Sequence, residues 1–115
     1  MDIKKFYQDT GSDYQRALSI MMNDVLIERM IKKFMETNSY DSLIKAYETN
    51  DIKEVFSLSH ALKGVAGNLA LTKLFEIASE LTEATRNKIE ANIDNEINKL
   101  KETYQNIVET YNSLL

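Results

Sequence analysis

The 115-residue sequence contains no cysteine, no proline, no tryptophan and a single histidine, His60. Without cysteine the chain forms no disulfide, no thiolate metal site and no cysteine nucleophile. With only one imidazole it cannot build, within one chain, a metal site that needs two histidines. The lack of cysteine is compatible with a reducing compartment, and we expect a cytoplasmic protein without a metal or other cofactor of its own.

Long hydrophobic runs and an excess of basic residues are also missing. No apolar run approaches the roughly 18 residues that a membrane-spanning helix requires, and no signal peptide is recognisable at the start. The formal net charge is −4, whereas a nucleic-acid-binding protein needs a basic face to displace counterions from phosphates. We therefore expect no membrane and no nucleic acid among the partners, and a single domain over residues 1–115, which is long enough for one hydrophobic core.

Only three glycines are present, Gly11, Gly64 and Gly67. Sheet proteins depend on glycine and proline at their turns, and no segment of this sequence alternates apolar and polar residues over the length of a strand. Apolar residues instead recur at intervals of three and four, as on one face of a helix. The sequence thus predicts an all-α protein.

The periodicity and the capping residues predict where the helices lie. The expected segments are a lead-in at 2–7, a helix from residue 13, helices near 24–35, 51–69 and 72–86, and a last helix from residue 87. Asn38 and Ser39 are expected to break the helix near 24–35, and Leu43, Ile44 and Tyr47 to lie on a following or kinked segment. Three capping boxes are expected to begin helices, namely Ser12 with Gln15, Asp51 with Glu54, and Asn87 with Glu90. Thr72 is expected to cap the start of the helix near 72–86. Such helices with short connections predict an antiparallel four-helix bundle with short accessory N-terminal helices.

Two of these helices show the apolar stripe that should form the core. The predicted core residues are Val55, Leu58, Leu62, Val65, Ala66 and Leu69 in the first, and Leu74, Phe75, Ala78, Leu81 and Thr85 in the second. At about 100° per residue, His60 lies roughly 200° from Leu62, so we expect its side chain to point into solvent. The residues that share its face are Lys53, Phe56, Ser57, Lys63, Gly64 and Gly67.

The face around His60 is unusual because two glycines follow the histidine within one helix. Each glycine costs about 1 kcal/mol relative to alanine in a helix interior, so a surface that keeps Gly64 and Gly67 is expected to need close approach of another molecule. Lys63 would supply positive charge to an anion attached to His60. An exposed Phe56 would offer apolar area to a partner.

Plainer interpretations of the same residues stay open. A lone histidine on a helix is most often an ordinary surface residue, the glycines would also serve as packing notches between helices, and Phe56 would be core if the helix were rotated. A non-catalytic adaptor bundle with an inert histidine therefore stays open as an interpretation. The residue inventory argues against an enzyme with its own turnover, because no phosphate-binding loop exists and Glu76, Glu80 and Glu83 indicate only a solvated face.

The run His-Ala-Leu-Lys-Gly-Val-Ala-Gly-Asn-Leu at residues 60–69 resembles the signature of histidine-containing phosphotransfer (Hpt) domains. The resemblance covers roughly residues 13–114 and implies a four-helix bundle in which His60 carries a phosphoryl group. It further implies response-regulator receiver domains as partners, with a hybrid histidine kinase as a further candidate, and a monomeric state. The divalent cation would be brought by the receiver. The acidic residue and proline typical of dimerising kinase phosphoacceptors are absent, since Ala61 follows the histidine.

The sequence departs from the family pattern at two positions. Ala70 stands where the family commonly has glycine. Thr82 stands where the family often has a glutamine or glutamate that orients the imidazole. Thr82 is thus our candidate for orienting the ring of His60, with Ser57 as a substitute.

Overall fold

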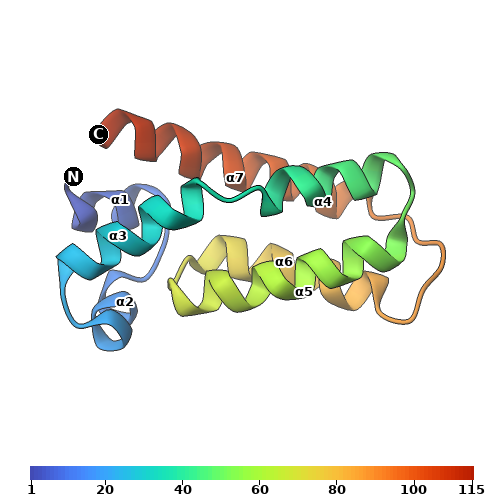
Figure 1. Cartoon of the computed structure of the whole chain (residues 1–115), viewed down its shortest axis with the longest axis horizontal. Coiled ribbons are helices and arrows are strands. Elements are labelled where there is room, and N and C mark those ends of the chain that lie inside the picture. Colours follow the sequence, from blue (N-terminus) through green and yellow to red (C-terminus); the bar gives the residue numbers. More distant parts are fainter.

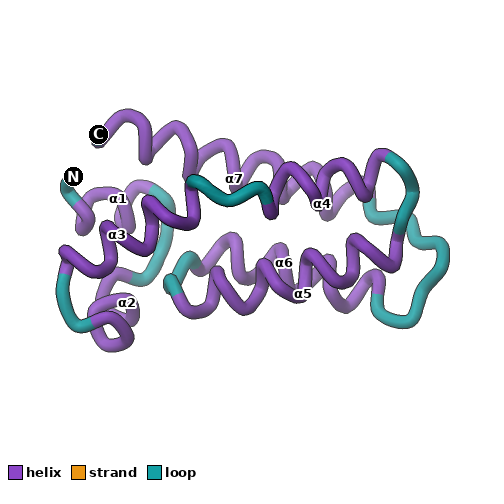
Figure 2. The backbone as a smooth tube through the Cα atoms, viewed as in Figure 1, coloured by secondary structure: helices purple, strands orange, loops and turns teal.

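The computed structural model describes all 115 residues, and these form helices and connecting loops without any strand (Figures 1 and 2). In chain order the helices are α1 (Ile3–Asp9), α2 (Tyr14–Met21), α3 (Asp24–Met35), α4 (Ser39–Glu48), α5 (Ile52–Asn68), α6 (Thr72–Thr85) and α7 (Asp94–Leu114). None of them combines the length and the apolar character that crossing a lipid bilayer requires.

Helices α4 to α7 form an antiparallel bundle, in which each helix runs opposite to the one before it (Figure 1). The bundle closes between α4 and α7, where Tyr40 stacks on Tyr104 with ring centroids 3.9 Å apart. Helix α3 lies in line with α4, and α1 and α2 pack at the end of the bundle near both termini (Figure 1). This confirms the predicted all-α four-helix bundle with accessory N-terminal helices.

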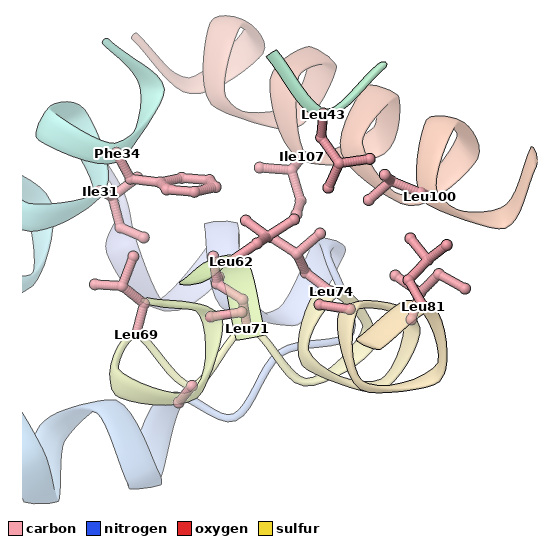
Figure 3. Close-up of a cluster of buried hydrophobic side chains, with 14 of the residues drawn as sticks. Ile31, Phe34, Leu43, Leu62, Leu69, Leu71, Leu74, Leu81, Leu100 and Ile107 are labelled. Carbon is pink, nitrogen blue, oxygen red and sulfur yellow. The ribbon is translucent and has the colours of Figure 1, made fainter. Parts of the chain in front are cut away.

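The hydrophobic core is a continuous cluster of 26 buried residues that runs the length of the molecule. The residues labelled in Figure 3 come from α3 to α7 and from the α5–α6 connection, and they point toward one another. They are Ile31, Phe34, Leu43, Leu62, Leu69, Leu71, Leu74, Leu81, Leu100 and Ile107. Helix α1 adds Ile3, Phe6 and Tyr7, all buried.

Helix α5 begins as expected but buries a slightly different stripe. The Asp51 carboxylate accepts a hydrogen bond from the Glu54 amide at 3.2 Å. The buried residues Ile52, Val55, Ser59, Leu62 and Ala66 follow at steps of three and four, a pattern that leaves the neighbouring Val65 outside.

Two predicted core residues are therefore wrong. Val65 is 42% exposed and Phe75 is 38% exposed. Val65 lies one position off the stripe that ends in Ala66. Phe75 packs on the surface of α5 instead of beneath it, beside Gly67.

Three predicted helix starts are also corrected. Asp13, not Ser12, caps α2, since its carboxylate accepts from the Arg16 amide at 3.0 Å, and an anion is favoured at the positive end of a helix. The Ser12 hydroxyl pairs with that of Thr10 instead, at 2.8 Å. Thr72 is already inside α6, which begins without a side-chain cap.

The last correction concerns the expected capping box at Asn87 and Glu90. Asn87 adopts the left-handed backbone conformation, with φ of 56°, and residues 86–93 form a connection before α7 begins at Asp94 (Figure 2). Asparagine tolerates this conformation better than most residues. The same residue type that caps helices therefore serves here as a turn residue.

Candidate functional site

His60 lies in the middle of α5 with its side chain exposed, while Leu62 two positions on is 2% exposed. The ring accepts and donates no hydrogen bond within the protein. The orientation predicted from the helical angle is thus confirmed. The C-terminal end and the middle of α5 are held to other elements by hydrogen bonds.

The ties at the C-terminal end of α5 come from the N-terminal segment. The Tyr7 hydroxyl donates to the Leu69 carbonyl at 2.7 Å, and the Asp13 amide donates to the Ala70 carbonyl at 3.0 Å. Ala70 takes the left-handed conformation with φ of 55°, which is the conformation that glycine adopts most readily. The chain therefore makes this turn without the glycine that the family pattern would place there.

Thr82 does not orient the imidazole in this structure. Its side chain is fully buried, and its hydroxyl donates to the Ala78 carbonyl at 2.7 Å and to the Ser59 hydroxyl at 3.3 Å. Because the hydroxyl is short and faces the α5–α6 interface, it ties the two helices together below His60. Ser57 likewise makes no hydrogen bond to the ring, so neither predicted partner serves the imidazole.

An aromatic ring takes the place beside the imidazole. Phe56, one turn earlier on α5, lies with its ring centroid 5.9 Å from that of His60, and the two planes are inclined by 23°. On the same phenyl ring rests the guanidinium of Arg86, 5.2 Å from the centroid. Arg86 in turn donates two hydrogen bonds to the Glu83 carboxylate, at 3.0 and 3.2 Å.

Of the charged residues near His60, Glu83 and Arg86 form an ion pair and Lys63 does not. The hydrogen bond and positive charge of Arg86 lower the pKa of the Glu83 carboxyl, and the nearby Lys63 and His60 lower it further. The same pairing raises the pKa of Arg86. Lys63 has no ion pair, and its ammonium lies 5.9 Å from the centroid of the Phe75 ring.

The two glycines of α5 play different parts. A Cβ at Gly67 would meet the Phe75 ring at 3.4 Å, so this glycine is a notch for an aromatic side chain of α6. A Cβ at Gly64 would meet nothing within 4 Å. The packing explanation therefore accounts for Gly67 alone, and the bare surface at Gly64 has no reason inside the fold.

His60 and Gly64 border an open hollow of about 320 Å³ on the surface. Its lining is Arg16, Ile20, His60, Lys63, Gly64, Gly67, Asn68 and Phe75. A second hollow, of about 400 Å³, is lined by Lys53, Phe56 and Ser57 with residues from the end of α6 and the following connection. The predicted face of α5 is thus divided into two neighbouring depressions.

Sequence reasoning did not place Arg16 or Arg86 in this region, and it assigned Glu83 only to a solvated face. The spacing of Glu83 and Arg86 by three residues on a helix was a usable signal for an ion pair. Nothing in the sequence placed Arg16 near His60, because that depends on how α2 packs against the end of α5.

The arrangement suits nucleophilic attack on an electrophile that carries anionic oxygens. An accessible imidazole offers a ring nitrogen, and an ammonium without a carboxylate partner lies one turn away on the same helix. The molecule has no group of three or more histidine or acidic side chains that could hold a metal ion.

Comparison with known families agrees with this geometry. Residues 24–110 match the family described as Hpt domain. Searches of curated proteins and of solved structures gave no match. The matched region contains α3 to α6 and most of α7, with His60 and its neighbours. The chain therefore belongs to the Hpt domain family, whose members carry phosphoryl groups in two-component signalling.

Proposed function

We propose that this protein is a phosphorelay intermediate, which accepts a phosphoryl group on His60 from the aspartyl phosphate of a receiver domain or from a kinase. It then passes the group to another response-regulator receiver. The observation that supports this most is the exposed imidazole of His60 beside the unpaired ammonium of Lys63 and the open surface at Gly64. An inert surface histidine would not need a glycine that nothing in the fold requires.

In the forward step a neutral ring nitrogen of His60 attacks the phosphorus of the aspartyl phosphate. The new N–P bond forms as the P–O bond to the aspartate breaks, and the carboxylate leaves with the electron pair of that bond. The return step to a second receiver reverses these roles. Because the transition state of phosphoryl transfer is loose, positioning and charge stabilisation supply most of the catalysis.

In this proposal each residue of the face has one task. Lys63 stabilises the charge on the phosphoryl oxygens. Gly64 keeps a side chain out of the way of the incoming domain, while Lys53, Phe56 and Ser57 contact it. The divalent cation belongs to the receiver, the domain works as a cytoplasmic monomer, and it catalyses no net turnover of its own.

The test is transfer of radiolabelled phosphate from a phosphorylated receiver to the wild-type protein and to His60→Gln. We expect label on the wild type that is lost in acid and kept in alkali, as for phosphohistidine, and none on the variant. Matching circular dichroism spectra would show that both proteins are folded. Equal labelling of the two, or no labelling of the wild type by any donor, would leave the adaptor interpretation in place.

A further inference from the structure

Four side chains form a continuous row that ends at the phosphoacceptor. Glu83 accepts two hydrogen bonds from Arg86, the Arg86 guanidinium covers Phe56 at 5.2 Å, and Phe56 lies nearly parallel to His60 at 5.9 Å. Two of these residues come from α5 and two from α6 or its end. Sequence reasoning gave Phe56 only a docking task, and the row shows a contact that docking does not explain.

The His60 side chain has no polar partner in the protein that would fix the orientation of its ring. It is exposed and has no hydrogen bond within the protein, and Thr82 faces away from it. A ring that turns freely about its side-chain bonds presents its nitrogen in the right direction only part of the time. In-line attack on phosphorus depends on that direction, so loss of orientation lowers the rate.

We propose that Phe56 is a positioning residue, which restricts the imidazole plane of His60 by stacking and replaces the ring-orienting hydrogen bond that this chain lacks. This inference rests on the proposed function. The four-residue separation places the two rings on one face of α5, one turn apart. The inclination of 23° means that the imidazole lies nearly parallel to the phenyl ring, so the contact restricts the plane of the imidazole.

Arg86 holds Phe56 in this position. A guanidinium is attracted to the face of an aromatic ring, and two hydrogen bonds to Glu83 keep it there although both side chains are largely exposed. The same pairing neutralises a carboxylate that lies near His60 and Lys63. An unpaired Glu83 would repel the oxygens of the phosphoryl group, so Arg86 acts on the site through two neighbours at once.

The test uses phosphoramidate, a small phosphodonor that needs no docking surface. Phe56→Leu keeps apolar area but removes the stack, whereas Phe56→Tyr keeps the stack. With phosphoramidate we expect Phe56→Leu to label His60 about three- to tenfold more slowly than the wild type, as for loss of one aromatic pair. The labelling rate of Phe56→Tyr should stay within about twofold of the wild-type rate. The rate of Arg86→Gln should lie between the rates of Phe56→Leu and Phe56→Tyr.

A matched control removes a different aromatic stack. Tyr40→Leu breaks the stack between α4 and α7, far along the chain from His60, and should leave the labelling rate unchanged. If the rate with phosphoramidate is the same for wild type and Phe56→Leu, the positioning role is overturned. If only the KM for a receiver rises in Phe56→Leu, then Phe56 is a docking residue alone.

A second measurement does not depend on phosphorylation. The ring-proton NMR signals of His60 should carry a ring-current shift that disappears in Phe56→Leu, remains in Phe56→Tyr, and remains in Tyr40→Leu. Unchanged signals in Phe56→Leu would overturn the stacking itself. A wild type that shows the shift but takes no phosphate from any donor would instead overturn the proposed function and leave the stack in place.

Discussion

Lys63 is the charged residue whose surroundings most favour a direct role in transfer. Its ammonium has an aromatic neighbour, Phe75, but no carboxylate partner. Because the Lys63 ammonium has no ion pair, it can bind an incoming anion without first breaking one. The position one turn from His60 brings it to the oxygens of a group bound to that ring.

Replacing Lys63 by methionine should slow labelling of His60 by phosphoramidate about tenfold or more, since a hydrogen bond to a charged group contributes about 1.5–3 kcal/mol. Lys63→Arg should recover part of the rate because the charge is kept. The control is Lys101→Met, which removes an exposed lysine on α7. A Lys63→Met protein as fast as this control would show that the ammonium takes no part.

Tyr7 links the N-terminal helix α1 to the C-terminal end of α5, the helix that carries His60. Its hydroxyl is buried and donates to the Leu69 carbonyl at 2.7 Å, and burial raises the pKa of this phenol far above its usual range. Tyr7→Phe leaves that carbonyl unpaired, and we expect it to lower the free energy of unfolding by about 1–2 kcal/mol. Denaturant titration at neutral pH measures this.

The raised pKa of Tyr7 also predicts an alkaline limit to stability. The folded protein keeps the phenol protonated, while the unfolded chain releases the proton near pH 10. The stabilisation is therefore complete below pH 10 and is lost as pH rises above it. The free energy of unfolding should fall less steeply between pH 10 and 12 in Tyr7→Phe than in the wild type, and equal slopes would contradict the assignment.

At the scale of helices, sequence reasoning predicted the bundle and the outward face of α5. It did not predict the turn after α6 or the residues of α6 that pack beside that face. The helix start at Asp51 was predictable because its side chain and the amide it caps are three residues apart. The turn at Asn87 was not, since asparagine favours both caps and left-handed turns. The roles of Thr82 and Arg86 depend on how α6 is rotated against α5, which local spacing does not determine.

The two glycines of α5 allow a test that separates helix stability from function. Gly64→Ala adds a methyl group to open surface and should raise the free energy of unfolding by about 0.5–1 kcal/mol. Phosphoramidate labelling should be unchanged, while transfer from a receiver should slow because the methyl group stands in the docking face. Gly67→Ala, which meets Phe75 at 3.4 Å, should gain less stability. Faster or unchanged receiver transfer in a stabilised Gly64→Ala would show that this surface is not approached closely.

At the scale of the whole molecule, the N-terminal helices belong to the same core as the bundle. The family match begins at residue 24, yet α1 buries Phe6 completely and sets its ring edge-on to Tyr111 of α7 at 6.4 Å. Helix α2 adds the buried Ala17 and Met21. The matched segment alone would therefore expose apolar surface at the end of the bundle where α5 turns into α6.

Deleting residues 1–22 should consequently cost most of the stability of the domain. Truncating one buried phenylalanine alone typically costs about 3–5 kcal/mol, against about 5–15 kcal/mol for a whole domain. We expect the melting temperature, followed by circular dichroism, to fall by at least about 15 °C or the transition to lose its cooperativity. Ile20→Ser, a change at an exposed position of α2, should shift it by no more than a few degrees. A truncated protein that melts cooperatively at the wild-type temperature would show that the bundle is complete without these helices, and that Tyr7 and Asp13 do not support the end of α5 on which His60 depends.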